Sequence, residues 1–253
     1  MADASAHNSR LLTREIGTII IDLDGTLVDS APDLADALDE LLLEYKLEPI
    51  GVDGTRKLIG HGIVNLVRKA LDLRGQPITP YVLETAATRF RELYAKRLPA
   101  RAVAYPGVMD ALIKLKQENW RLVVCTNKLE SFSRKILEGL GLAKFFDVIA
   151  GPDTYGVAKP DPRHLLRALP AHMPPGYKVI MIGDSEVDVE TAHAAHIPVI
   201  AVTYGYSKTP LADLKPQALA GHFSEVPKLV KKLATDTAAK FIHSANNEAR
   251  SIP

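Results

Sequence analysis

Short apolar runs alternate with segments of helical periodicity along most of the chain. Runs of strand length occupy residues 18–21, 122–125, 148–149, 179–182 and 199–202. Apolar positions at helical spacing predict helices over residues 108–117, 130–140, 162–169, 188–195 and 226–233. Strands that alternate with helices form a parallel sheet with right-handed crossovers, so the pattern predicts an α/β fold. A last short strand is predicted at His222-Phe223.

Residues 31–100 interrupt this alternation, because their apolar positions repeat at helical spacing and no convincing strand occurs among them. Such a block does not continue a sheet, so it predicts a helical domain inserted into the α/β domain. The α/β domain is then expected to be discontinuous, with residues 15–30 and 101–236. Residues 1–14 and 237–253 lack periodicity and are expected to be flexible tails.

Composition and charge narrow the class of protein. The 31 basic and 30 acidic residues nearly balance, and no basic stripe or charged tail suggests binding to nucleic acid or to a membrane surface. No apolar run is long enough to span a bilayer. The single cysteine, Cys125, excludes an internal disulfide framework and fits a reducing compartment. A cytoplasmic protein is therefore expected, and nothing in the pattern sets its oligomeric state.

The first apolar run ends at two carboxylates, Asp22 and Asp24, which Gly25-Thr26 follow. In an open α/β sheet, ligands bind beyond the carboxyl ends of the strands, so the acidic pair lies where chemistry is expected. An ordinary turn also favours Asp and Gly. A turn does not, however, require Asp-x-Asp-Gly-Thr in that order after a buried strand, so we favour the functional interpretation.

Two further strand ends carry polar residues. Thr126-Asn127 follows the second strand, and its hydroxyl and amide can hydrogen-bond a phosphate without adding charge. A plain Thr-Asn turn explains that stretch equally well. Lys159-Pro160 follows the third strand, where the lysine can offer a point charge to a phosphoryl group and to an aspartate. A solvated surface lysine is the alternative.

The fourth strand end gives a stronger signal. Gly183-Asp184 ends a buried strand, and Asp188 follows four residues later at the start of a predicted helix. Asp188 could simply complement the N-terminus of that helix. Asp184 is harder to explain in structural terms, because a carboxylate at the end of a buried strand needs a partner such as a cation.

Together the four strand ends supply acids, a hydroxyl, an amide and a lysine, and these groups have a coherent chemistry. Hard oxygen ligands without a cysteine cluster favour Mg²⁺ over Zn²⁺. The cation and Lys159 would neutralise the charge of a transferred phosphoryl group. A central aspartate can attack phosphorus and form an acyl phosphate that water cleaves. A second acid can protonate the leaving oxygen and then take a proton from the water.

These motifs, in this order, resemble those of the haloacid dehalogenase superfamily over about residues 16 to 233. The resemblance implies a Rossmann-like core with an inserted helical cap. It implies that Asp22 is the nucleophile and Asp24 the general acid and base. Mg²⁺ would bind the carboxylates of Asp22 and Asp184 and the main-chain carbonyl of Asp24. The phosphoryl group would be held by Thr126, Asn127 and Lys159, and Asp188 would orient Lys159 or a water molecule on the metal.

Within the superfamily the sequence is most similar to bacterial phosphoglycolate phosphatases, through residues 22–33 and 56–62. The similarity implies a small phosphorylated metabolite as substrate, with 2-phosphoglycolate the first choice. In the cap, Gly60 and Gly62 break the helical pattern between two predicted helices and would give a loop that can approach a ligand closely. Arg56 or His61 could then meet the carboxylate of the substrate. A Gly-rich connector with solvated basic residues explains the stretch as well.

Several other activities share these core residues. A sugar phosphomutase, a sugar phosphatase or a pyrophosphatase would differ mainly in the cap. A dehalogenase is disfavoured, because its chemistry does not call for the acid that Asp24 supplies. A non-catalytic binding protein on the same fold would be expected to carry a broken motif, and every motif here is intact.

Overall fold

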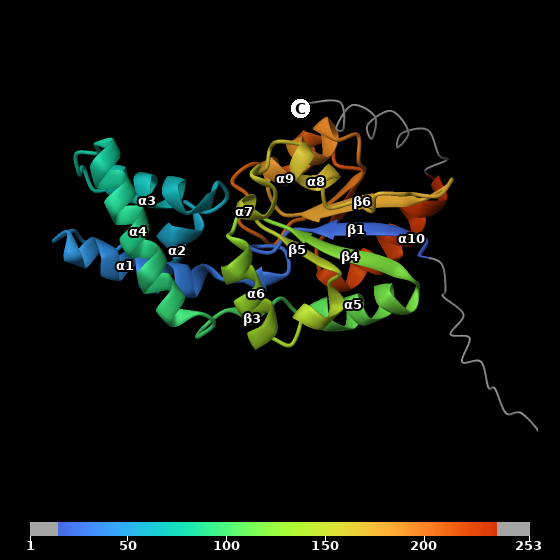
Figure 1. Cartoon of the computed structure of the whole chain (residues 1–253), viewed down its shortest axis with the longest axis horizontal. Coiled ribbons are helices and arrows are strands. Elements are labelled where there is room, and N and C mark those ends of the chain that lie inside the picture. The colour runs from blue at the N-terminus through green and yellow to red at the C-terminus, as the bar shows by residue number, and fades with distance from the viewer. Residues whose placement is uncertain (1–14, 237–253) are drawn as a thin grey trace, which may run out of the picture.

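A computed structural model of the chain describes residues 15–236, so the tails expected at 1–14 and 237–253 lie outside the described residues. Its centre is a six-stranded parallel sheet with the order β5-β4-β1-β6-β7-β8 (Figure 1). The strands are β1 (Gly17–Ile21), β4 (Trp120–Cys125), β5 (Val148–Ala150), β6 (Lys178–Gly183), β7 (Val199–Val202) and β8 (Ala218–Ala220). The α/β fold expected from the alternating pattern is therefore confirmed.

Helices cover both faces of the sheet, which explains why its strands are apolar along their whole length. Ile19 and Ile21 of β1 face a layer that includes α5, α6 and α10, whereas Ile20 faces α8 and α9. These helices are α5 (Val108–Gln117), α6 (Glu130–Gly139), α8 (Arg163–Leu166), α9 (Glu186–Ala194) and α10 (Val226–Asp236). A one-turn helix, α7 (Pro152–Tyr155), follows β5.

The helical block lies beyond one end of the sheet, and its buried side chains continue the cluster that covers one face of the sheet (Figure 1). It contains α1 (Ala31–Glu44), α2 (Gly51–Arg56), α3 (Gly62–Leu73) and α4 (Pro80–Arg97). Buried leucines of α1, among them Leu38 and Leu41, recur at helical spacing and pack in the same cluster as Phe90 of α4. The helical insertion is thus confirmed as a feature of the fold, while its limits at residues 31 and 100 stay a prediction.

Two short strands join the helical block to the sheet domain. In β2 (Val28–Asp29) and β3 (Val103–Ala104), Val28 pairs with Ala104 and Asp29 with Val103 in antiparallel register. The chain therefore leaves and re-enters the sheet domain side by side. This pairing fixes the base of the helical block next to the strand end that carries Asp22 and Asp24.

The strand expected at His222-Phe223 is wrong. The sixth strand is β8, and residues Phe223–Glu225 form a short 3-10 turn. The ring nitrogen Nδ1 of His222 accepts a hydrogen bond from the main-chain N–H of Ser224 at 3.2 Å and caps that turn. Phe223 is fully buried because its ring packs into the core from the turn. Among the described residues, no helix is both long and apolar enough to cross a membrane.

His164 of α8 provides a test of the packing beneath the sheet. Its side chain is completely buried, and burial together with the charge of Lys159 lowers the pKa of the imidazole to about 4. The unfolded chain then takes up a proton below pH 6.5 that the folded chain refuses, so stability falls as the pH drops from 6.5 towards 4. The loss attributable to this group is on the order of 3 kcal/mol. His164→Leu should reduce the slope of unfolding free energy against pH in that window, measured by urea denaturation. An unchanged slope would contradict the assignment.

Candidate active site

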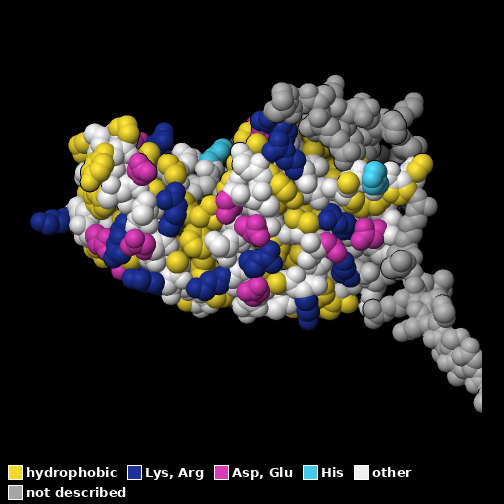
Figure 2. Space-filling view, in the orientation of Figure 1, with side chains coloured by type: hydrophobic (Ala, Val, Ile, Leu, Met, Phe, Trp, Pro, Cys, Tyr) yellow, Lys and Arg dark blue, Asp and Glu magenta, His cyan; other side chains and the backbone are white. Residues whose placement is uncertain are grey.

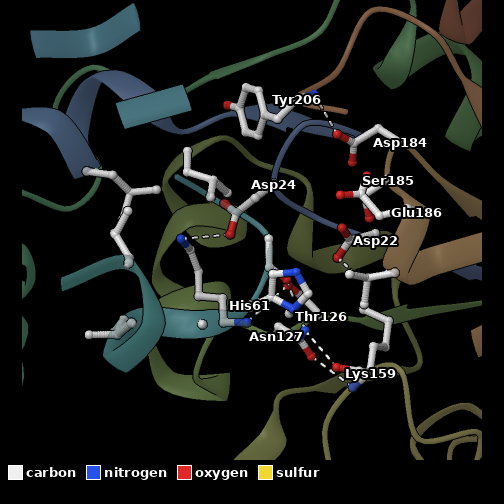
Figure 3. Close-up of a pocket in the computed structure, with 18 of the residues that line it drawn as sticks. Asp22, Asp24, His61, Thr126, Asn127, Lys159, Asp184, Ser185, Glu186 and Tyr206 are labelled. Carbon is white, nitrogen blue, oxygen red and sulfur yellow. Dashed lines mark hydrogen bonds and ion pairs between the residues drawn. The ribbon is translucent and has the colours of Figure 1, made fainter. Parts of the chain in front are cut away.

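A cavity of about 120 Å³ lies at the carboxyl edge of the sheet, between the strand ends and the helical block (Figure 3). Residues that follow three neighbouring strands line its floor, because parallel strands end at the same edge. The structure brings nearly all the expected side chains to this cavity, namely Asp22, Asp24, Thr126, Asn127, Lys159 and Asp184. The seventh, Asp188, is fully buried beside them and contacts Lys159.

Three buried carboxylates converge on one point. Asp22, Asp184 and Asp188 each offer an oxygen atom, and these atoms lie within 4.8 Å of one another. Lys159 is the cation beside them: its Nζ lies 2.8 Å from Oδ1 of Asp22 and 2.6 Å from Oδ1 of Asp188. Burial would lower the pKa of this ammonium group, but the charges of Asp188 and Asp22 outweigh it and raise the pKa.

One lysine does not neutralise three carboxylates. Burial raises the pKa of Asp22 to about 7, although Lys159 acts in the opposite direction. Burial, followed by the charges of Asp188 and Asp22, also raises the pKa of Asp184 well above its ordinary value. The site therefore has an excess of negative charge in a poorly solvated place, and its donors are all hard oxygens. This donor set fits a divalent cation such as Mg²⁺.

Local contacts hold Asp184 in position. The hydroxyl of Thr26 donates to its Oδ1 at 2.8 Å, and the main-chain N–H of Tyr206 donates to its Oδ2 at 2.7 Å. Gly25 has φ +84° and approaches Asp184 so closely that an added Cβ would lie 2.3 Å from Oδ2. Glycine at this position is therefore required both by the backbone conformation and by the contact. The Gly25-Thr26 pair after the acidic motif thus connects the first strand end to the fourth.

Asp24 belongs to a different group of side chains. Its Oδ2 lies 2.9 Å from Nζ of Lys128, and its Oδ1 accepts a hydrogen bond from the hydroxyl of Ser30. Lys128 is buried, and its Nζ lies 4.9 Å from the centre of the Tyr94 ring in α4. Figure 3 shows the Asp24 carboxylate turned away from Asp184 and towards a lysine nitrogen. The carboxylates of Asp22 and Asp24 are therefore in separate environments.

Sequence reasoning missed Lys128. The only signal available was its position, directly after Thr126-Asn127 at the end of a buried strand. Burial would lower the pKa of Lys128, but the negative charge of Asp24 more than compensates and raises it. Lys128 is thus a buried cation paired with the second carboxylate, as Lys159 is with the first.

The side chain of Asn127 is engaged by main-chain groups. Its Nδ2 donates to the carbonyl oxygens of Lys159 at 3.0 Å and of Gly60 at 3.1 Å, and its Oδ1 accepts from the N–H of Lys159 at 2.9 Å. Asn127 therefore joins the loop of Lys159 to the loop of the helical block. The hydroxyl oxygen of Thr126 accepts a hydrogen bond from the main-chain N–H of Lys128 at 3.2 Å, as in a local Thr-Asn turn.

The cap residues that the sequence suggested do not all lie at the cavity. Gly60 and His61 line the cavity, and His61 projects into it (Figure 3). Arg56 is not among the lining residues: its guanidinium pairs with Asp29 at 2.7 Å and with Asp53 at 3.0 Å. The hydroxyl of Tyr206 donates to the same Asp29 at 2.6 Å. Arg56 therefore ties the helical block to the sheet domain.

Comparison with known proteins agrees with this geometry. The family model of the haloacid dehalogenase-like hydrolases matches residues 19–202. The chain therefore belongs to the haloacid dehalogenase-like hydrolases.

The relatives that this chain resembles within the family have more specific names than the family itself. A phosphoglycolate phosphatase of Mesorhizobium japonicum is 34% identical over 229 residues, which cover 90% of this chain and 98% of the relative. One from Rhodospirillum rubrum is 39% identical, over 82% of this chain and 88% of the relative. A crystal structure of a predicted phosphoglycolate phosphatase from Haemophilus somnus superimposes with a TM-score of 0.79 at 28% identity, and covers 86% of this chain and 99% of its own.

The carboxylate group can be tested by metal binding without any substrate. A cation that binds only the folded state raises the melting temperature with its concentration. We expect Mg²⁺ to raise the melting temperature of the unaltered chain by several degrees, and Asp184→Asn to remove most of the increase, in thermal-shift measurements at pH 7.5. Glu186→Gln is the matched control, because Glu186 lines the same cavity outside the carboxylate group. Equal shifts in both variants would place the metal elsewhere.

Proposed function

We propose that this protein is a Mg²⁺-dependent phosphomonoester hydrolase that works through an aspartyl-phosphate intermediate and acts on 2-phosphoglycolate. The observation that carries the proposal is the position of Asp22. It follows the central strand, borders the cavity, pairs with Lys159 and shares a group of carboxylates able to hold a cation. A nucleophilic carboxylate needs this combination of access and positive charge to meet a phosphate dianion.

In the proposed reaction, an oxygen of Asp22 attacks phosphorus, and the bond to the leaving oxygen breaks. Lys159 holds the phosphoryl oxygens while Asp188 and Asn127 keep the lysine and its loop in place. Mg²⁺, held by Asp22 and Asp184 with the main-chain carbonyl of Asp24, would neutralise charge on the phosphoryl group when bound. Thr126, at the edge of the cavity, can donate its hydroxyl proton to a phosphoryl oxygen.

Proton transfer is assigned to Asp24. It protonates the leaving oxygen, and it later takes a proton from the water that cleaves the acyl phosphate, so that glycolate and phosphate leave and Asp22 is restored. Its pairing with Lys128 and Ser30 holds this carboxylate in one orientation, apart from the carboxylates around Lys159. Apolar side chains of the helical block, including Ile59, Ile63 and Leu66, line the cavity and help to exclude bulk water.

The choice of substrate rests on two supports. The relatives at 34% to 39% identity over most of this chain are named phosphoglycolate phosphatases. The cavity of about 120 Å³ favours a small phosphate ester over a nucleotide. A sugar phosphate, pyrophosphate and a phosphomutase reaction would use the same Asp22 and Lys159, and a panel of substrates separates them.

The proposal predicts that Asp22→Asn abolishes turnover. An amide oxygen does not form the acyl phosphate, so kcat for 2-phosphoglycolate should fall by at least about 10³-fold while the far-ultraviolet circular dichroism is retained. Phosphate release is measured on 2-phosphoglycolate, pyrophosphate, glucose 6-phosphate and ethyl phosphate, with and without Mg²⁺. Unchanged turnover in the variant would show that another residue is the nucleophile. No release from any ester by the unaltered chain would favour the mutase or the non-catalytic protein.

Lys128 is predicted to position Asp24. Lys128→Met leaves the Asp24 carboxylate without its buried cation, so we expect kcat to fall by about 10- to 100-fold with a much smaller change in KM. Lys144→Met is the matched control, since Lys144 also lies over an aromatic ring, Phe145, but is exposed and remote from the cavity. A change in KM alone would assign Lys128 to substrate binding instead.

A further inference from the structure

Four lysines line the cavity, and they fall into two kinds. Lys128 and Lys159 are buried and paired with aspartates. The other two, Lys69 and Lys208, form no ion pair with any of the residues 15–236 that the structure describes. Lys128 and Lys159 therefore face carboxylates of the protein even before a ligand binds, whereas Lys69 and Lys208 have no such partner among the described residues and can give their charge to a ligand.

Lys69 and Lys208 line the cavity from different parts of the fold. Lys69 lies on α3 of the helical block, and Lys208 lies in the segment that follows β7 of the sheet domain. They are nevertheless close enough to repel each other: burial and then the charge of Lys208 lower the pKa of Lys69. The folded chain thus brings two like charges together over a cavity, which costs free energy unless an anion lies between them.

We propose that Lys69 and Lys208 form an anion site that holds the second charged group of the substrate, at the end remote from the phosphoryl group that Asp22 attacks. This inference rests on the proposed function and adds the residues that select among phosphate esters. The shared chemistry is a carboxylate or a second phosphate, and 2-phosphoglycolate supplies the former. A plain alkyl phosphate supplies neither.

Besides the aspartates and the lysines, the charged or titratable residues that line the cavity are Glu186, His61 and Tyr206. Glu186 acts on the pKa of Lys69 in the direction opposite to Lys208, and its Oε2 accepts a hydrogen bond from the hydroxyl of Ser207 at 3.3 Å. One carboxylate against two ammonium groups leaves a net positive charge. His61 also lines the cavity and is exposed, so it is the competing candidate for the same anion.

The two lysines of the proposed anion site belong to different parts of the fold, so a bound anion connects these parts. Because one lysine belongs to the helical block and the other to the sheet domain, an anion that contacts both draws the two together over the reacting phosphoryl group. An ester without the second anion gains no such contact. The preference for an ester with a second anion over one without it should therefore appear in binding, and it should depend on both lysines together.

The test compares 2-phosphoglycolate with ethyl phosphate in the unaltered chain, Lys69→Met, Lys208→Met and the double variant. We expect each single variant to lower kcat/KM for 2-phosphoglycolate by about 10-fold, chiefly through KM, and the double variant by about 30- to 100-fold. For ethyl phosphate we expect changes near twofold. Arg68→Met is the matched control, because Arg68 is the exposed neighbour of Lys69 on α3 and does not line the cavity.

A binding measurement separates failure of this inference from failure of the proposed function. In Asp22→Asn, which should not turn over substrate, calorimetric titration gives the Kd of 2-phosphoglycolate with Mg²⁺ present. Adding Lys69→Met or Lys208→Met should raise that Kd about 10-fold, whether or not the unaltered chain hydrolyses the ester. An unchanged Kd, or an equal loss of ethyl phosphate binding, would overturn the anion site.

Two further comparisons identify the chemical class of the anion and the residue that binds it. Preference of the unaltered chain for 1,3-propanediol bisphosphate over 2-phosphoglycolate, lost in the lysine variants, would support the site with a phosphate in place of the carboxylate. If His61→Gln removes the preference for 2-phosphoglycolate and the lysine variants keep it, the site is overturned and the anion belongs to His61.

Discussion

The excess of buried negative charge around Asp22 is the constraint on which the rest of the site depends. Asp22, Asp184 and Asp188 meet within 4.8 Å, and Lys159 is the only lysine paired with any of them among the described residues. Burial of unbalanced carboxylates is unfavourable, which is why the pKa values of Asp22 and Asp184 are raised. Hydrogen bonds from Thr26 and from the main chain of Tyr206 offset part of this unfavourable free energy and hold Asp184 in place. A fold arranged only for stability would not keep such a group, so its retention points to a cation and to an anionic substrate.

The carboxylate of Asp24 is held in a different environment. If Asp24 joined the first group, the repulsion would increase and its proton would be shared with three other acids. Instead, Ser30 and Lys128 hold it apart, and the Tyr94 ring of α4 covers that lysine. The helical block therefore supports Asp24 directly, and it also contacts the loop of Lys159 through Gly60 and Asn127. A displacement of the helical block would alter both groups at once, so in the proposed reaction the position of this block affects proton transfer and phosphoryl binding together.

The sequence predicted those parts of the structure that leave a local signal. The strand ends of Asp22 and Asp184 followed from apolar runs, because a parallel sheet brings its carboxyl ends together whatever the order of its strands. Lys128 left no such signal: its partner Asp24 lies 104 positions away, and a lysine after a strand is ordinarily solvated. Likewise, the capture of Arg56 by Asp29 depends on tertiary packing, and so does the bond between Tyr206 and Asp29, which are 177 residues apart. The strand expected at His222-Phe223 failed because a side-chain cap on a turn outweighed β-propensity, whereas β8, made of Ala218–Ala220, carries little β-propensity of its own.

In the proposed function, the two kinds of lysine separate the chemistry of the site from its choice of substrate. Lys128 and Lys159 are buried within ion pairs, so replacing either leaves an uncompensated carboxylate and, in the proposed reaction, would affect every substrate. Lys69 and Lys208 form no such ion pair with the described residues. Each lies on a segment outside the sheet, so that a substitution there need not alter the strands. Specificity is a difference of affinities, and it is set most economically by charges that the fold does not itself require. The residues that decide the substrate are therefore to be sought at the junction of the helical block and the segment after β7, and not among the strand-end motifs that define the family.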